Sequence, residues 1–212
     1  CLGHVSVTYN GREADKETPT YGGYSTAIVV DENYGLKIPD NLALDVAAPL
    51  MCAGITLYSP LHRWGAGPGV RVGIVGLGGL GHMGVKIAHA MGAEVTLISH
   101  SAHKEDDAKR LGANNFLLSS DKDAMKAARY SFDLIINTVS AKIDIDRYLS
   151  LLTLDGTMVM VGVPEEPLSL RTFSMIIARR SLAGSNIGGI KETQEMLDFC
   201  AEHGFGSDVE II

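Results

Sequence analysis

A glycine-rich turn between an apolar strand and an amphipathic helix constrains the fold of this chain more than any other feature. The short run Val72–Val75 is apolar and leads into Gly76-Leu77-Gly78-Gly79-Leu80-Gly81. Apolar residues then recur at helical spacing from Leu80 to Met91. In such a unit the first glycine allows a tight turn, the second lets the backbone approach a ligand, and the third lets the helix lie close to the strand.

This glycine spacing is typical of loops that bind the pyrophosphate of a dinucleotide. Free backbone N–H groups and the positive end of the helix dipole would face the phosphates. We therefore expect the coenzyme to contact four glycines and one leucine: Gly76, Gly78, Gly79, Leu80 and Gly81. The alternative is a glycine-rich turn without a ligand. His82 follows the motif, and it either faces the phosphates or is an ordinary helix residue.

Apolar strands alternate with helices along most of the chain. The patterns predict strands at 70–75, 94–99, 115–118, 132–139, 157–162 and 181–185. They predict helices at 79–91, 102–111, 122–129, 145–152, 171–179 and 191–203. Such alternation indicates a parallel sheet covered by helices on both faces. Six strands complete a doubly wound α/β fold of the Rossmann type.

The residues before the glycine motif have a different character. Residues 1–20 are polar and rich in turn formers, which predicts a loop, whereas 24–30 is an apolar β run. The apolar stretch 43–59 predicts a buried or broken helix. A membrane span over 43–61 is disfavoured because Pro49, Gly54 and Pro60 interrupt it. The chain has no starting Met and stops in an apparent strand, so we expect it to be a fragment.

Charge and cysteine usage exclude several classes of function. The formal net charge of -7 argues against a nucleic acid or an anionic membrane as partner. The three cysteines, Cys1, Cys52 and Cys200, lie far apart in the sequence. An odd number without local clustering favours a reducing compartment, hence the cytoplasm, over a disulfide framework.

The end of the second predicted strand indicates which dinucleotide is bound. Sites for NAD usually place a carboxylate about 20 residues after the glycines to hold the ribose hydroxyls. Here the strand ends in Ser99-His100-Ser101, and Lys104 follows. Two hydroxyls and a cation suit a 2′-phosphate, which a carboxylate would repel. We therefore favour NADP(H) over NAD(H); the alternative is that Ser99 merely ends a strand and Lys104 is solvated.

Four motifs, in order, resemble a known enzyme family. They are Gly22-Gly23-Tyr24, Pro49-Leu50-Met51-Cys52-Ala53-Gly54-Ile55-Thr56, Gly76–His82 and Gly188-Gly189-Ile190-Lys191-Glu192-Thr193. Together they resemble the cinnamyl alcohol dehydrogenase branch of the zinc-dependent medium-chain alcohol dehydrogenases, over nearly the whole chain. The resemblance implies NADP(H)-dependent interconversion of primary alcohols and aldehydes, with a catalytic zinc that polarises the carbonyl oxygen.

The resemblance also assigns roles to single residues. It implies that Cys52 is the last protein ligand of the catalytic zinc and that Thr56, one turn further on, meets the nicotinamide. It places Val139, Val161 and Val163 at strand ends beside the nicotinamide, and Ser185, Asn186 and Ile187 on the edge strand that holds its carboxamide. The same edge strand, near Ser185, would pair with its twin in a homodimer. Cys1 resembles the last of four cysteines that hold a structural zinc.

The domain boundaries expected from the resemblance are 1–42, 43–190 and 191–212. They correspond to a remnant of a β-rich GroES-like catalytic domain, the NADP-binding Rossmann domain, and a C-terminal helix with the start of a return to the catalytic domain. The family's other zinc ligands lie in sequence that precedes Cys1. We therefore expect these 212 residues to bind no catalytic zinc, or to bind it weakly, and to lack activity.

Two other functions remain open from the sequence. A zinc-free reductase of the same superfamily, acting on quinones or enones, would share the fold and the coenzyme but would need no cysteine at position 52. A non-catalytic NADP-binding module would bind the coenzyme without turnover.

Overall fold

The computed structural model describes residues 9–13, 15–23 and 26–210 and divides into two compact units, Cys1–Gly35 and Leu36–Ile212. In the first unit, β1 (Tyr9–Arg12) and β2 (Pro19–Tyr21) form an antiparallel hairpin. The loop predicted over residues 1–20 is therefore wrong for these strands. Polar side chains close the hairpin locally, because the Asp15 carboxylate accepts hydrogen bonds from the Glu17 and Thr18 N–H groups at 2.8 and 2.9 Å.

The β run predicted at 24–30 is also wrong where it is described. Residues 26–30 carry no regular structure, and the Val29 side chain is 99% exposed. Among the described residues of this unit, strands pair only in the β1–β2 hairpin, so this apolar run has no neighbouring strand to bond with. A short 3₁₀ helix, η1 (Glu32–Tyr34), ends the unit with Asp31 as its N-cap.

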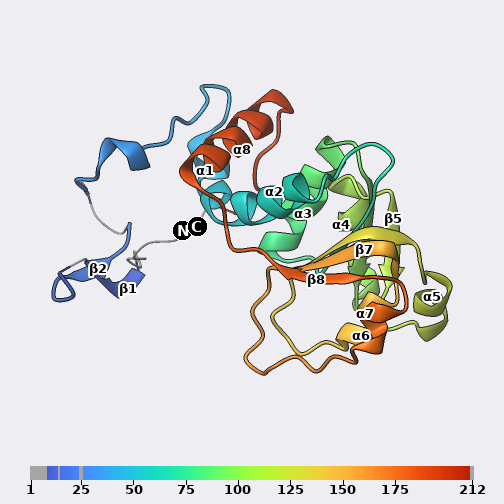
Figure 1. The fold of residues 1–212 in the computed structure, drawn as a ribbon. Helices are drawn as coiled ribbons and strands as arrows, with labels where there is room; N and C mark the ends of the chain where they lie inside the picture. Colours follow the sequence, from blue (N-terminus) through green and yellow to red (C-terminus); the bar gives the residue numbers. More distant parts are fainter. Residues whose placement is uncertain (1–8, 14, 24–25, 211–212) are drawn as a thin grey trace. The chain divides into compact units, whose positions relative to one another are not determined.

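The second unit is built on a six-stranded, fully parallel sheet (Figure 1). Its strands are β3 (Arg71–Val75), β4 (Glu94–Ser99), β5 (Asn115–Leu118), β6 (Phe132–Asn137), β7 (Leu152–Met160) and β8 (Ser181–Gly184). The spatial order is β5-β4-β3-β6-β7-β8. The order reverses between β3 and β6, and ligands of doubly wound sheets bind at such a switch point. The predicted Rossmann-type α/β fold is confirmed.

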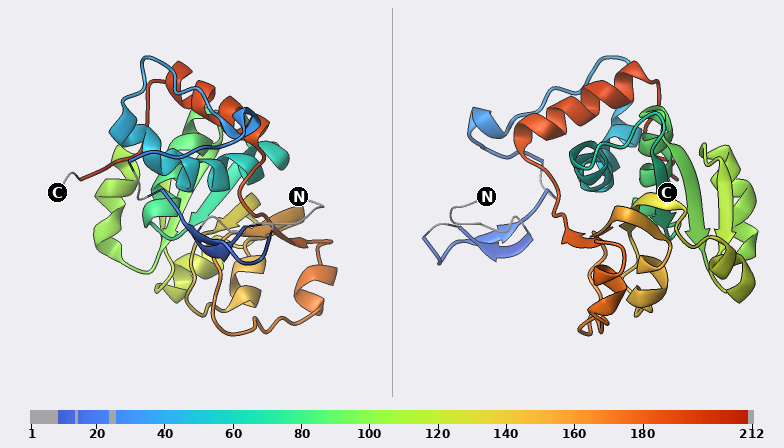
Figure 2. Two further views of the ribbon diagram at one scale, coloured as in Figure 1. Left: turned by 90° about the vertical axis from the view of Figure 1, so that its left-hand side faces the viewer. Right: turned by 45° about the vertical axis from the view of Figure 1, so that its right-hand side comes forward.

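Helices cover both faces of this sheet. They are α1 (Leu44–Ala47), α2 (Ala53–Arg63), α3 (Gly79–Ala90), α4 (Glu105–Arg110), α5 (Lys122–Ala127), α6 (Ile145–Leu149), α7 (Phe173–Ile176) and α8 (Ile190–Glu202). The 3₁₀ helices η2 (Ala48–Met51) and η3 (Ala102–Lys104) precede α2 and α4. Figure 2 shows α8 beside α2, which it contacts.

Successive strand residues alternate between two apolar cores. Ile74 belongs to the core that also holds residues of α2, α3 and α8, whereas the next residue, Val75, belongs to the core under α5 and α6. Both side chains are at most 2% exposed. This period-two alternation places the buried apolar residues of the central strands on one core or the other. Apolar side chains are therefore needed on both faces, and the central strands have nearly continuous apolar sequences.

Several predicted element bounds differ from the structure. The helix predicted at 171–179 shrinks to α7, because Arg179 takes a left-handed conformation (φ 47°) and the Arg180 N–H bonds the Met175 carbonyl at 2.9 Å. The strand predicted at 157–162 begins earlier, at Leu152, and ends at Met160. The helix predicted at 102–111 is η3 followed by α4, and Gly112 beyond it has a φ of 104°.

The apolar stretch at 43–59 is a broken helix, as predicted. It forms α1, η2 and α2, with a break at Cys52, whose backbone angles are φ -122° and ψ -69°. Leu50, Leu57 and Leu61 are fully buried in the core that α3 and α8 share. Among the described residues, no single helix is long and apolar enough to cross a membrane; Leu44–Met51 and Ala53–Arg63 reach that length only together, with a bend of 59°.

Candidate functional site

The glycine loop joins β3 to α3 and lies at the switch point of the sheet. Gly76 has a φ of 92°, which turns the chain sharply at the end of β3. A Cβ atom on Gly81 would lie 2.0 Å from the Gly76 carbonyl oxygen, so the helix can approach the strand only with glycine there. In contrast, a Cβ atom on Gly78 or Gly79 would meet nothing within 4 Å. Gly76 and Gly81 therefore allow the turn and the close packing of α3, whereas Gly78 and Gly79 leave open space beside the loop.

The start of α3 presents unpartnered backbone donors to this open space. Gly78 is the N-cap and supplies no side-chain hydrogen bond, and the first bond into the helix runs from the His82 N–H to the Gly78 carbonyl at 3.0 Å. The early N–H groups of a helix have no acceptor of their own in the helix. Because α3 has 12 residues and no acidic side chain in its first turn, this end has the positive dipole that attracts anions.

A cavity of about 770 Å³ opens against this loop. The structure brings together at its wall eight of the predicted coenzyme residues: Gly76, Gly78, Gly79, Leu80, Ser99, Ser101, Lys104 and Val139. Gly81 is buried in the turn directly beneath the loop. Such a volume is within the range of small-ligand sites, about 300–1,000 Å³. The glycine loop and the predicted phosphate recess therefore border one cavity.

At the end of β4, Ser99 and Ser101 are held against each other. The Ser99 hydroxyl accepts a hydrogen bond from the Ser101 N–H at 3.2 Å, and Ser99 is only 6% exposed. Nearby, the Lys104 ammonium lies 3.9 Å from Asp107, which is an ion pair but too long for a hydrogen bond. Its three N–H donors are thus not saturated by this carboxylate.

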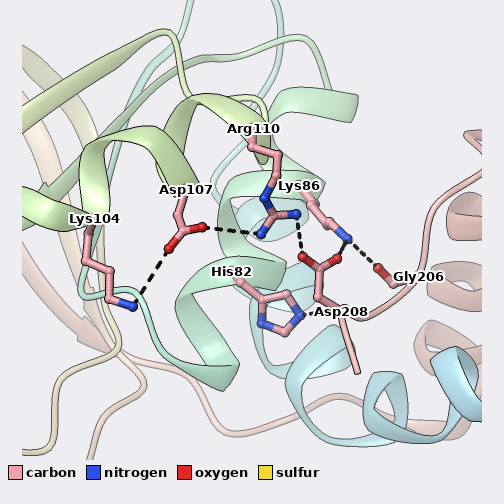
Figure 3. A network of polar contacts seen from close by, with 7 residues as sticks. All are labelled: His82, Lys86, Lys104, Asp107, Arg110, Gly206 and Asp208. Atoms are coloured by element: carbon pink, nitrogen blue, oxygen red, sulfur yellow. Dashed lines mark hydrogen bonds and ion pairs between the residues drawn. The ribbon is translucent and has the colours of Figure 1, made fainter. Parts of the chain in front are cut away.

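Asp107 continues into a network that ends on the C-terminal segment. The Asp107 carboxylate lies 3.6 Å from the Arg110 guanidinium, which in turn lies 2.7 Å from the Asp208 carboxylate, and Figure 3 shows these residues side by side. Asp208 also accepts from Lys86, and this bond, followed by the one from Arg110, holds the pKa of its carboxyl below the usual range. The Asp208 N–H donates to His82 Nε2 at 3.3 Å. His82 is therefore an engaged helix residue, the second of the two alternatives.

The sequence reasoning missed several residues of the cavity. Thr138 follows β6 and donates its hydroxyl hydrogen to the Val75 carbonyl at 2.7 Å, which ties the switch point together. Asp144 caps α6, while Lys142 and Arg147 add cations to the wall. The polar pair Asn137-Thr138 at the end of an apolar strand was the available signal, since parallel strands end at the same edge of a sheet.

Other predicted site residues do not line this cavity. They are Cys52, Thr56, Val161, Val163, Ser185, Asn186 and Ile187. Thr56 is buried on α2 one turn after Cys52, and its N–H bonds the Cys52 carbonyl at 3.1 Å. Val163 is 81% exposed, and Ile187 is 48% exposed with a φ of 39°. Their coenzyme roles stay predictions.

The edge strand β8 ends one residue earlier than predicted, at Gly184. The Ser185 N–H still continues the pairing, because it bonds the Met160 carbonyl at 3.1 Å. Within the described part of the chain, β8 pairs with β7 alone, so its outer edge has no neighbouring strand.

The predicted metal ligands are not gathered in the described structure. Cys52 is exposed at the start of α2 and is a free thiol. Cys1 lies outside the described residues. Among the residues that are described, no three His, Cys, Asp or Glu side chains come together as a metal site requires. These residues therefore do not by themselves fit a zinc ion, and whether the chain retains any zinc stays a prediction.

Comparisons with known proteins agree on one family. A sequence profile described as "Zinc-binding dehydrogenase" matches residues 79–202. The chain is 58% identical to NADP-dependent alcohol dehydrogenase C of Mycobacterium tuberculosis (strain CDC 1551 / Oshkosh), over 100% of this chain and 61% of that protein. It therefore spans about three fifths of the length of that relative.

Solved structures give the same picture. A cinnamyl alcohol dehydrogenase of Sorghum bicolor superposes with a TM-score of 0.94 at 45% identity, over 98% of this chain and 60% of that one. The cinnamyl alcohol dehydrogenase of Helicobacter pylori, solved with NADP(H), gives 0.85 at 44% identity, over 94% and 56%.

Proposed function

Because the chain belongs to the zinc-binding dehydrogenase family, we propose that it is the coenzyme-binding part of an NADP(H)-dependent alcohol dehydrogenase that interconverts primary alcohols and aldehydes. The observation that carries the proposal is the single cavity shared by the glycine loop and the Ser99–Lys104 recess. The similar proteins include an NADP-dependent alcohol dehydrogenase and a dehydrogenase solved with NADP(H), which supports the same proposal.

Different residues of the cavity would contact different parts of the coenzyme. The open Cβ positions of Gly78 and Gly79 leave room for a pyrophosphate against the N–H groups of the first turn of α3. The Ser99 and Ser101 hydroxyls and the Lys104 ammonium would hold the 2′-phosphate, because they offer donors and positive charge. Val139 lines the same cavity near the strand ends. When bound, the nicotinamide would accept a hydride from the alcohol or donate one to the aldehyde.

The nicotinamide end of the site is a proposal that extends beyond the cavity. We assign it to Thr56, Val139, Val161 and Val163, with the carboxamide held by Ser185, Asn186 and Ile187. In support, Val161 N–H bonds the Asn137 carbonyl at 3.0 Å, which aligns the end of β7 with the end of β6 at the switch point. Cys52 precedes Thr56 by one helical turn at the start of α2, so the proposed zinc ligand and the proposed nicotinamide contact would lie on neighbouring turns of one helix.

Zinc belongs to the proposal for the whole enzyme. Cys52 would provide one ligand of the catalytic zinc, and Cys1 one ligand of a structural zinc, with the other ligands supplied from outside these 212 residues. The exposed thiol of Cys52 is accessible for such a role. For these 212 residues alone we propose a narrower function, which is NADP(H) binding without turnover.

Calorimetric titration with NADPH and NADH tests the coenzyme. We expect saturable NADPH binding that is tighter than NADH binding, and no saturable signal with either coenzyme would reject the proposal. Aldehyde reduction by a longer chain that carries the remaining ligands tests the chemistry. There, Cys52→Ala should abolish turnover but keep NADPH binding; full activity of that variant would favour the zinc-free quinone or enone reductase.

We also propose a homodimer that forms through the edge strand near Ser185, and a cytoplasmic location. Two observations support the dimer: the outer edge of β8 has no partner strand among the described residues, and Ile187, which follows β8, is an exposed apolar side chain. Light scattering after gel filtration should give twice the chain mass, and Ile187→Lys should shift the protein to monomer. A monomeric unsubstituted protein would reject this interface.

A further inference from the structure

A second cavity, of about 640 Å³, lies between α5, α6 and α7 and has a wall rich in cations. We call it the basic pocket. Six cationic side chains line it: Lys122, Lys126, Arg129, Arg147, Arg171 and Arg180. Asp146 is the one carboxylate among its lining residues. The whole chain has 25 acidic and 18 basic residues. A third of its basic residues therefore gather at one pocket of an acidic protein, which gives the pocket a local positive potential.

The floor of the basic pocket holds a buried charge. Arg180 is 7% exposed, and its guanidinium donates to the Leu152 carbonyl at 2.9 and 3.1 Å and to the Ser174 carbonyl at 3.0 Å. In the described structure, Arg180 makes no ion pair with any carboxylate. Carbonyls satisfy its N–H groups but do not balance its charge, and buried charges are normally paired.

Tyr130 forms the wall beside this arginine in an uncommon conformation. Its φ is 60°, which is rare for a large side chain. The Arg180 guanidinium carbon lies 4.9 Å from the centre of the Tyr130 ring, and Tyr130 is 51% exposed. Strained backbone persists where the surrounding structure holds it, and it is common at binding sites. Tyr130 and Arg180 thus contact each other at the wall without a ligand.

Three more cations of the basic pocket, Lys122, Lys126 and Arg129, also lack a carboxylate partner among the described residues. Lys122 and Lys126 are exposed, and neither they nor Arg129 forms an ion pair with a described residue. The two lysines are four positions apart on α5, a spacing at which like charges repel. Asp146 carries one negative charge against these cations, and its oxygens accept from the Arg171 backbone N–H at 3.1 and 3.3 Å.

We propose that the basic pocket binds a small anion that carries a pyrophosphate or a longer phosphate chain. Six cations against one carboxylate leave an excess of five positive charges at the wall. Arginine forks and lysine ammonium groups are the side chains that bind phosphate oxygens most strongly. A single phosphate would neutralise less than half of this excess, which favours a ligand with two or more phosphates. The volume is enough for a small ligand.

Calorimetry on the full chain with inorganic pyrophosphate tests the proposal. Saturating NADP⁺ is present throughout, so that the cavity at the glycine loop is occupied, and ionic strength is held constant. We expect saturable binding. The double variant Lys122→Gln/Lys126→Gln should weaken it by about tenfold or more for each lysine, as the loss of charge-assisted hydrogen bonds predicts. Both lysines are exposed, so thermal melting should show that the variant still folds.

A matched control removes the same charge elsewhere. Lys37→Gln/Lys191→Gln also takes away two positive charges, both outside the basic pocket, and should leave pyrophosphate affinity within about twofold. Equal loss in both double variants would overturn the proposal. So would the absence of saturable pyrophosphate binding in a chain that binds only one NADP⁺. Arg147 is left unchanged because it lines both cavities.

The result is separable from the proposed function. Ser99→Asp should weaken NADPH binding and leave pyrophosphate binding in the basic pocket unchanged. Lys122→Gln/Lys126→Gln should weaken pyrophosphate binding and leave NADPH binding at the glycine loop unchanged. If NADP⁺ itself is an occupant, titration without pyrophosphate will show two coenzyme sites per chain, and the lysine variant will retain one. That outcome supports the pocket as a phosphate site. If NADP⁺ binds nowhere, the proposed function fails, but the loss of pyrophosphate affinity in the lysine variant still tests the basic pocket.

Discussion

The carbonyl oxygen of Gly76 occupies the space that a Cβ atom on Gly81 would need, 2.0 Å away. Both partners are main chain, so neither can rotate aside. We therefore expect Gly81→Ala to push α3 away from the end of β3 and to lower the free energy of unfolding by about 3 kcal/mol, near the upper end for overpacking a core. Urea denaturation followed by circular dichroism measures this. An unfolding midpoint equal to that of the unsubstituted chain would contradict the close approach.

Gly78→Ala should separate folding from binding. A Cβ atom at Gly78 meets nothing within 4 Å, and its φ of -121° is open to any residue. We expect unchanged or slightly higher stability, since alanine reduces the freedom of the unfolded chain. The methyl group would nevertheless stand where the pyrophosphate is proposed to lie, so NADPH affinity should fall about tenfold or more. Unaltered affinity would place the phosphates elsewhere.

Ser99→Asp should change the preference between the two coenzymes. The substitution puts a carboxylate at the end of β4, where the 2′-phosphate is proposed to bind. It replaces a hydrogen-bond donor by a negative charge, which repels the negative phosphate. We expect NADPH binding to weaken by about 2 kcal/mol, the scale of a hydrogen bond to a charged group, while NADH binding holds or improves. Parallel titrations give the ratio of affinities. Ser120→Asp, an exposed neighbour, is the matched control.

The sequence predicted the sheet well because its signals are local. Each central strand is an apolar run buried on both faces, and glycines such as Gly112 and Gly204 end helices in the left-handed region, as expected. The hairpin at β1–β2 was missed because its polar side chains do not alternate with apolar ones. Conversely, the apolar residues at 26–30 resemble a strand but have no described strand to pair with.

The site was predicted only as far as local motifs extend. The glycine loop and the Ser99–Lys104 segment lie within single strand–helix units, so their spacing revealed them. Thr138 and Arg147 reach the same cavity from other units, through the order of strands in space. The basic pocket was not predicted at all. Its cations come from two helices, α5 and α6, and from segments next to α5 and α7, and only the packing of these helices brings them together.

The two described cysteines should differ sharply in reactivity. Cys200 is fully buried beside Met196, and burial raises the pKa of its thiol to about 12. Almost none of it is thiolate at pH 8, and the thiolate is the reactive form. Cys52 is exposed. Iodoacetamide should therefore modify Cys52 in the native chain and reach Cys200 only in denaturant. Peptide mass spectrometry measures both, and native labelling of Cys200 would show that α8 opens.

The pair Arg71–Asp133 should make stability depend on pH. The Asp133 carboxylate accepts from Arg71 Nη2 at 2.8 Å, and from Nε and the backbone N–H at 3.0 Å. The side-chain bond from Arg71 is the main reason that the pKa of Asp133 lies below its usual range. A carboxyl with a lowered pKa in the folded state stabilises that state above its unfolded pKa, about 3.9, and loses this contribution as the pH falls further.

A double-mutant cycle over Arg71→Gln and Asp133→Asn isolates this contribution. Both side chains are more than a third exposed, at 42% and 36%, so solvent screening limits the coupling energy to about 1 kcal/mol at pH 7. We expect that coupling to decline as the pH falls below about 4, as Asp133 becomes protonated. Urea denaturation of all four proteins at pH 7, 5 and 3 measures it. A coupling energy that stays constant down to pH 3 would show that the carboxylate charge does not contribute to the link between β3 and β6.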